Sequence, residues 1–111
     1  MRTLEFTVEK QQLRKKAGCD FSNIVAGSIG YLKAKFYFSE DEWKDCRKVA
    51  SFWIGTTSYP VRLDEDDECI VPSEVLGEEK FLVSVKGARV NNGKATYKIE
   101  TNKFKVRQEV R

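Results

Sequence analysis

The sequence predicts an all-β protein: an antiparallel β-sandwich of about eight strands with one or two single helical turns. Polar and apolar residues alternate along most of the chain, as they do in strands that bury one face. Turn-forming residues interrupt these segments at intervals of about 8 to 12 residues. Helical periodicity is confined to two short stretches, which disfavours a helical or mixed fold.

The first two predicted strands lie near the N-terminus. In the segment TLEFTVE, one face carries Leu4, Phe6 and Val8. In YLKAKFYF, Phe36 and Phe38 share a face and the two lysines take the other. Both segments therefore favour strands with one face in the core and one in water.

The middle of the chain predicts two more strands, VASFWIG and SYPVRL. Pro60 has no N–H for a strand ladder, so the second of these is expected at a sheet edge or with a bulge. The segments KFLVSVKGARV and KATYKIET flank Asn92-Gly93, and Asn-Gly is a strong hairpin signal. The last segment, KFKVRQEV, alternates apolar residues with charged ones and predicts a final strand, with Phe104, Val106 and Val110 on its apolar face.

Single helical turns are predicted around Trp43 and in VPSEVLG, where Pro72 fits the first helical position and Gly77 a stop. The large apolar residues of the alternating segments give a predicted core: Phe36, Phe38, Trp43, Phe52, Val71, Phe81, Val83 and Val85.

The 111 residues are predicted to form one domain, residues 1–111, because this length is typical of a single domain. Apolar residues make up 41% and charged residues 33%, which is typical of a folded chain and not of a disordered one. No apolar run approaches the roughly 18 residues that a membrane helix needs, so no membrane contact is expected.

Charge is distributed unevenly along the chain. Lys and Arg outnumber Asp and Glu by seven to three in residues 1–36 and by eight to two in residues 81–111, whereas residues 37–80 hold five against twelve. The basic ends and acidic centre suggest complementary contacts with a partner or with another copy of the chain. A solvated surface without a partner is the alternative.

Catalytic and metal-binding patterns are missing from the sequence. His is absent, and Cys19, Cys46 and Cys69 are far apart, which excludes the usual zinc signatures and the Ser–His and Cys–His nucleophiles. The glycines form neither a dinucleotide-binding motif nor a phosphate loop. The chain is therefore predicted to be no enzyme, to carry no metal or cofactor, and to keep its cysteines as buried thiols.

Five consecutive acids stand in the centre of the chain: Asp64, Glu65, Asp66, Asp67 and Glu68. A calcium loop of the EF-hand type that began at Asp64 would need Gly and Glu where Cys69 and Val75 stand. The run is therefore interpreted as a solvated turn, with an irregular calcium loop as the alternative. A docking role stays open for these acids and for three cations near the C-terminus: Lys103, Lys105 and Arg107.

Several short segments resemble, in order and spacing, a module of tail proteins in phages of Gram-positive bacteria. These segments are Phe38-Ser39 with Trp43, Phe52 with Gly55, YPVRLD (59–64), CIVPSEV (69–75), FLVSVKG (81–87) and IETN (99–102). The resemblance extends from about residue 2 to residue 107, and the module is similar to the N-terminal domain of baseplate upper proteins.

The resemblance implies a β-sandwich that docks on the tail hub and helps to carry receptor-binding parts. It implies a non-catalytic structural role in the virion tail, assembly in the bacterial cytoplasm, and other tail or baseplate proteins as partners. Two further hypotheses stand behind it. One is an extracellular sugar- or cell-wall-binding module that uses Trp43 or Trp53. The other, less favoured, is a nucleic-acid-binding β-domain that uses the basic ends.

Overall fold

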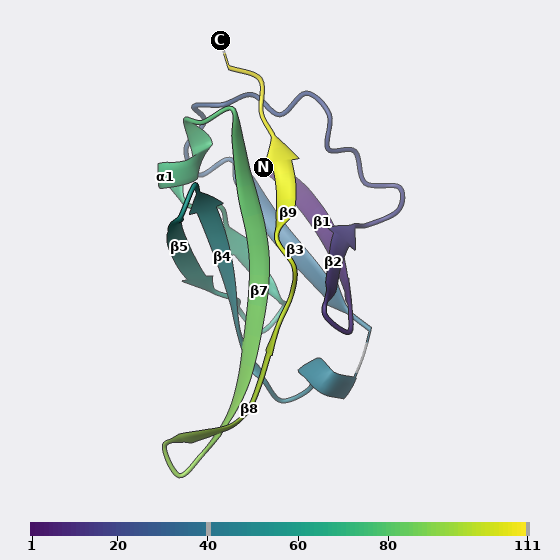
Figure 1. The fold of residues 1–111 in the computed structure, drawn as a ribbon. Helices are drawn as coiled ribbons and strands as arrows, with labels where there is room; N and C mark the ends of the chain where they lie inside the picture. Colours follow the sequence, from purple (N-terminus) through teal and green to yellow (C-terminus); the bar gives the residue numbers. More distant parts are fainter. Residues whose placement is uncertain (40, 111) are drawn as a thin grey trace.

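Two β-sheets packed face to face make up the computed structural model, which describes residues 1–39 and 41–110 (Figure 1). The predicted β-sandwich is thereby confirmed. The strands and helical turns of the described residues are, in chain order, β1 (Arg2–Glu9), β2 (Gln12–Lys15), β3 (Leu32–Phe38), η1 (Asp41–Trp43), β4 (Arg47–Ile54), β5 (Thr57–Arg62), β6 (Glu68–Ile70), α1 (Ser73–Leu76), β7 (Lys80–Asn91), β8 (Lys94–Glu100) and β9 (Phe104–Arg107).

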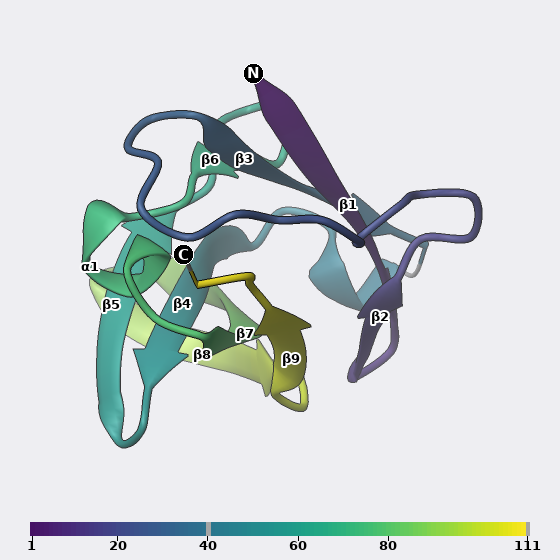
Figure 2. The ribbon, with the colours of Figure 1, turned by 90° about the horizontal axis from the view of Figure 1, so that it is seen from above.

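The four-stranded sheet has the order β2-β1-β3-β6, and its central pair, β1 and β3, is parallel. The antiparallel pairing that the sequence predicts is wrong at this one pair. A parallel connection must bring the chain back to the end where β1 begins. The loop between β2 and β3 does this by running across one end of the sandwich, between the two sheets (Figure 2).

The five-stranded sheet has the order β5-β4-β7-β8, and β9 also pairs with β7. The long strand β7 has twelve residues and two partners on the same edge. Its first part pairs with β9, from Lys80 to Val83, and its second part pairs with β8, from Lys86 to Asn91. The residues between β8 and β9 therefore lie beside the middle of β7.

The core lies between the two sheets and is rich in aromatic rings. Phe6 on β1 and Phe36 on β3 are direct neighbours in register, and their stacked ring centroids lie 5.1 Å apart. Phe21 from the loop and Phe104 from β9 meet Phe6 edge-on. Seven of the eight residues that the sequence predicts for the core are buried: Phe36, Trp43, Phe52, Val71, Phe81, Val83 and Val85. The eighth, Phe38, is partly buried and packs at the margin of the core.

The turns follow the chemistry of their residues. The β7–β8 hairpin has positive φ at Asn92 (52°) and at Gly93 (76°), as a tight hairpin turn of this type requires. Pro60 lies on β5, which is an edge strand, so its missing N–H removes no bond from the middle of the sheet.

The two predicted helical turns are present as η1 and α1. Pro72 stands one position earlier than predicted, at the N-cap of α1, and Gly77 ends the turn as predicted. With three and four residues, the helical segments of the described chain are too short to cross a membrane.

Side-chain bonds tie the sheets together at their margins. The Asn102 amide bonds to the backbone of Leu13 on β2, with its Oδ1 2.7 Å from the Leu13 nitrogen and its Nδ2 3.4 Å from the Leu13 oxygen. The Trp43 indole donates to the Lys10 carbonyl at 2.7 Å. These bonds join the β1–β2 hairpin to segments that are distant in the sequence.

Candidate functional site

The acidic run forms the turn between β5 and β6, and Asp64 organises it. Its Oδ1 accepts hydrogen bonds from the backbone nitrogens of Asp66 (2.9 Å) and Glu68 (3.0 Å). The Asp64 backbone also bonds to Asp67 and Glu68. Such side-chain-to-backbone bonds are typical of Asx turns. One of the five acids is therefore used to shape the turn.

Two further acids form ion pairs within the chain. Glu68 contacts Lys33 at 2.6 Å and Lys35 at 3.3 Å, both on β3, and Asp67 contacts Lys48 at 3.1 Å. The hydrogen bond from Lys33 lowers the pKa of Glu68, and the Glu68 carboxylate raises the pKa of Lys35.

The remaining acids, Glu65 and Asp66, are exposed at the tip of the turn. Among the residues that the structure describes, no group of three His, Cys, Asp or Glu side chains is placed to hold a metal ion. The ion pairs of the turn are with Lys33 and Lys35 on β3 and Lys48 on β4, whereas the predicted docking cations Lys103, Lys105 and Arg107 lie beside or on β9. The turn thus pairs with cations other than the predicted docking set.

The outer face of the five-stranded sheet collects cations from every strand of that sheet. Residues that pair across the sheet point to the same side, so the strand register together with burial defines this face. We call it the basic face. Its cations are Arg47, Arg62, Lys80, Lys86, Lys98, Lys103, Lys105 and Arg107. Among the outward residues described in these strands, only Glu100 is acidic.

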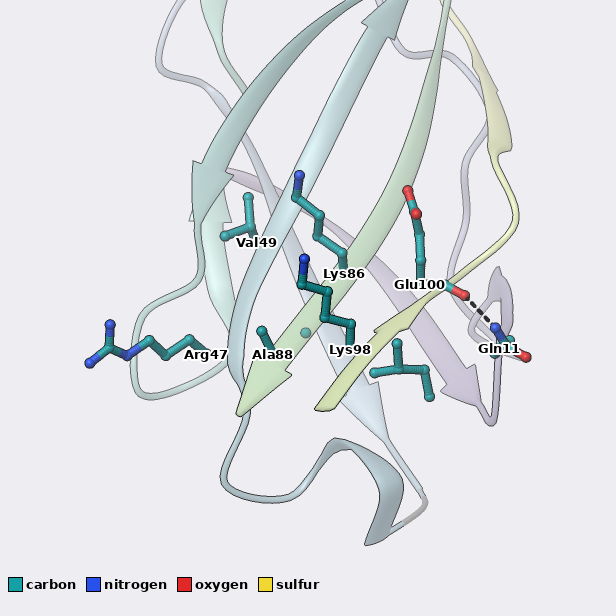
Figure 3. Close-up of a pocket in the computed structure, with 9 residues that line it drawn as sticks. Gln11, Arg47, Val49, Lys86, Ala88, Lys98 and Glu100 are labelled. Carbon is teal, nitrogen blue, oxygen red and sulfur yellow. Dashed lines mark hydrogen bonds between the residues drawn. The ribbon is translucent and has the colours of Figure 1, made fainter. Parts of the chain in front are cut away.

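A hollow of about 520 Å³ opens at the lower part of this sheet (Figure 3). The small residue Ala88 lies between Arg47 on β4 and Lys98 on β8, its direct neighbours in register. Lys86 and Lys98 extend side by side over the sheet, and Val49 lies beside them (Figure 3). The hollow thus combines a short apolar floor with three cations and one acid, Glu100.

Trp53 lies on the basic face but is not free. Its indole nitrogen donates to the Ser84 hydroxyl at 3.0 Å, and Lys103 Nζ stands 3.8 Å from its ring centroid. The ring is partly buried, and the two serines beside it, Ser51 and Ser84, are buried. Trp43 is fully buried, so its ring offers no platform for a sugar.

Both termini and the loop between β2 and β3 lie at one end of the sandwich (Figure 1). These segments carry large apolar side chains that are exposed. Exposure is 69% for Met1, 79% for Ile29, 53% for Tyr31 and 61% for Val110. We call these four residues the apolar end. The Arg2 nitrogen bonds to the Tyr31 carbonyl, and a bridge between residues 25 and 109 brings the C-terminal segment to the same loop.

A smaller hollow, of about 190 Å³, opens beside the apolar end. Its lining is largely apolar and includes Ile24, Leu32 and Leu76, with Tyr31 at its margin and Gln108 in its wall. Gln108 is only 6% exposed. A polar side chain in such a wall needs hydrogen-bond partners.

Only the nitrogen of the Gln108 side-chain amide has hydrogen-bond partners. Its Nε2 donates to the carbonyls of Val75 (3.1 Å) and Glu78 (2.8 Å), which fixes the orientation of the amide. In the described part of the chain, its buried Oε1 has no hydrogen-bond partner. The structure thus leaves one buried acceptor without a partner on a residue that lines the hollow.

Gln108 was missed as a candidate in the sequence, although a pattern pointed to it. In KFKVRQEV the apolar alternation of Phe104 and Val106 continues to Gln108, a polar residue in an apolar position. The alternation continues to Val110, which was expected inside but is exposed, because β9 ends at Arg107.

The cysteines are free thiols in three settings. Cys69 on β6 is buried, and burial raises the pKa of its thiol to about 12. At neutral pH it is therefore protonated and a poor nucleophile. Cys19 and Cys46 are only partly buried, so the expectation of three buried thiols is wrong for these two.

Comparison of the chain with known proteins gave no match to a family model, a curated protein or a solved structure. The geometry of the chain itself therefore carries the functional argument.

Proposed function

We propose that the chain is a non-catalytic structural module of a phage tail or baseplate, which docks through its apolar end on a neighbouring tail protein. The observation that carries this proposal is the apolar end itself, with the Gln108 hollow beside it. The short segments that resemble tail modules support the biological setting. In this proposal the protein belongs to the virion tail and assembles in the host cytoplasm.

The energetics of the apolar end favour a protein partner. Large exposed apolar side chains on segments at one end of a domain are candidates for an interaction site, and covering them removes apolar surface from water. A buried acceptor without a partner costs about 1 to 3 kcal/mol, so Gln108 Oε1 gains by meeting a donor of the docked protein. Tyr31, which is both exposed and at the margin of the hollow, is the natural anchor of such a contact.

Calorimetric titration against the purified tail-hub protein of the same phage tests the proposal. Ile29→Ser and Tyr31→Ser are each expected to weaken association by about tenfold or more, because each removes a central apolar contact. Val90→Ser is the matched control, since Val90 is exposed at the distal β7–β8 hairpin. The affinity of an apolar contact is expected to change little with salt.

Two results would contradict the proposal. One is no association with the hub protein at any salt concentration. The other is an equal loss of affinity in Ile29→Ser and Val90→Ser, which would move the contact away from the apolar end.

A further inference from the structure

We propose that the basic face binds the phosphate backbone of double-stranded DNA without selecting bases. This activity is separate from the proposed docking, since it uses the outer face of the five-stranded sheet and not the apolar end. The sequence favoured nucleic acid least of the three hypotheses, because it placed the C-terminal lysines on the solvated face of one strand. The structure adds cations from the neighbouring strands to that same face.

The charge of the basic face is mostly positive. Eight cations stand against one acid, Glu100, among the outward residues described in these strands and at Lys103. Acids occur at its margins, where the exposed Glu109 follows Arg107 and the acidic turn lies beside Arg47 and Arg62. Lys80 and Arg107 are even direct neighbours in register, an arrangement that destabilises a sheet by like-charge repulsion. A polyanion laid across the face would relieve this repulsion.

The outer face of the other sheet shows the contrast. There Glu68 lies between Lys33 and Lys35, and the Tyr37 hydroxyl donates to Glu5. Lys33 and Lys35 are therefore paired with an acid within the chain. On the basic face, Lys103 is placed over an aromatic ring, and no ion pair to any of the eight cations is recorded among the described residues.

The spacing of the cations suits a phosphate chain. Lys103, just before β9, and Lys105 and Arg107 on it follow one another at every second residue, with steps of about 6.6 to 6.8 Å in extended chain. Each step equals the rise of about two phosphates of one DNA strand along the duplex axis, at about 3.4 Å each. Arg47 on β4 and Lys86 on β7 carry positive charge onto the neighbouring strands, so the area that can contact phosphates is wider than one strand.

The composition of the face favours nucleic acid over an acidic protein. Five of its eight cations are lysines, and lysine is depleted at protein–protein interfaces. None of the strongly exposed large apolar residues belongs to the central rows of this face, where the larger apolar side chains Val49, Trp53 and Leu82 are partly buried. An aromatic hot spot of the kind that anchors protein partners is therefore missing from the described face.

The same face gives no means of reading bases. Trp53 is the aromatic residue on it, and its ring is held by Ser84 and covered by Lys103. Stacking of bases on free aromatic rings, which single-strand binders use, is thus blocked. Contacts are left to the phosphates, and these carry no sequence information.

Fluorescence anisotropy with a labelled DNA duplex, over a series of salt concentrations, tests the inference. With four cations on phosphates, affinity is expected to fall about 100-fold between about 50 and 200 mM salt. The face variant combines Lys86→Gln, Lys98→Gln, Lys105→Gln and Arg107→Gln. It is expected to reduce the slope of log affinity against log salt by about one for each cation removed.

A control variant removes the same charge elsewhere. It combines Lys10→Gln, Arg14→Gln, Lys15→Gln and Lys44→Gln, all exposed and outside the basic face. Each variant removes four positive charges, so the formal net charge falls from +3 to −1. The control is expected to keep most of the affinity and slope, and circular dichroism checks that both variants fold. Glu100→Gln should bind more tightly than the wild type, because it removes the acid that lies among the cations of the face.

Three outcomes would overturn the inference. The first is no binding of the duplex at low salt. The second is an equal loss in the face and control variants, which would mean that net charge alone attracts the duplex. The third is tighter binding of poly-L-glutamate than of the duplex in the same buffer, which would assign the face to an acidic protein surface.

Discussion

Gly87 on β7 lies directly against the indole of Trp43. A methyl group on Gly87 would stand 3.0 Å from Trp43 Cε3 and 3.1 Å from Cys46 Cβ, closer than ordinary van der Waals contact. Glycine is needed at this position because the neighbouring side chains leave no room for a Cβ atom. Its φ is not positive, so backbone conformation does not require it. The contact joins the middle of the longest strand to the helical turn that follows β3, and so fixes one end of the sandwich.

Gly87→Ala is therefore expected to destabilise the protein by about 1 to 3 kcal/mol, the usual cost of overpacking a core. Gly77→Ala is the matched control, because a methyl group there meets nothing within 4 Å and its φ is −87°. That change is expected to be neutral or stabilising by up to about 1 kcal/mol. Urea unfolding of both variants measures the difference, and equal stabilities would contradict the steric account.

Trp43→Ala is expected to cost about 3 to 5 kcal/mol, because it empties a fully buried site beside Phe38. Trp43→Phe keeps much of the ring but loses the bond to the Lys10 carbonyl, and a loss of about 1 to 3 kcal/mol is expected for that acceptor. Urea unfolding measures both. A loss below about 1 kcal/mol for Trp43→Ala would show that the ring contributes little to the core.

Much of the fold could be predicted because its strands alternate regularly. The faces of β1 and β3, the Asn92-Gly93 turn and the edge position of Pro60 all follow from local rules. Strands β2 and β6 were missed as strands because they are only four and three residues long. Their pairing with β1 and β3 depends on tertiary contacts that no local pattern carries.

The two interaction surfaces were harder to predict. The basic face gathers cations from strands between residues 47 and 107, and strand order decides that they become neighbours. The alternation of KFKVRQEV showed one row of this face and none of the others. The apolar end depends on the parallel pairing of β1 with β3, which sends the loop with Ile29 and Tyr31 across the end of the sandwich.

Asp64 is expected to matter more for stability than its exposed neighbours in the acidic turn. Asp64→Ala removes an acceptor of two backbone nitrogens, and a loss of about 1 kcal/mol is expected. Glu65→Ala, at the exposed tip, is the control and should stay within about 0.5 kcal/mol of the wild type. Thermal unfolding of the two variants, with and without calcium, is the measurement. A calcium-dependent rise in the melting temperature of the wild type would contradict the interpretation as a plain turn.

Glu68 is expected to make the stability of the protein depend on acid pH. Its folded-state pKa lies below the ordinary value of 4.5, chiefly because Lys33 donates a hydrogen bond to it. A carboxylate of this kind stabilises the folded state fully at pH values above the unfolded pKa. The stabilisation is lost as the pH falls below 4.5 and through the lower folded pKa, because the folded state must then take up a proton against the two lysines.

Urea unfolding of the wild type and of Glu68→Gln, between about pH 7 and pH 3, measures this effect. The wild type is expected to be the more stable near neutral pH, and the difference should shrink as acid protonates Glu68 and approach zero below the folded pKa. Glu65→Gln is the control, since Glu65 is exposed at the turn tip and should show no such change in the difference. A difference between wild type and Glu68→Gln that stays constant with pH would show that the carboxylate has the same pKa in the folded and unfolded chain. The contacts with Lys33 and Lys35 would then add nothing to stability, as is common for ion pairs at a protein surface.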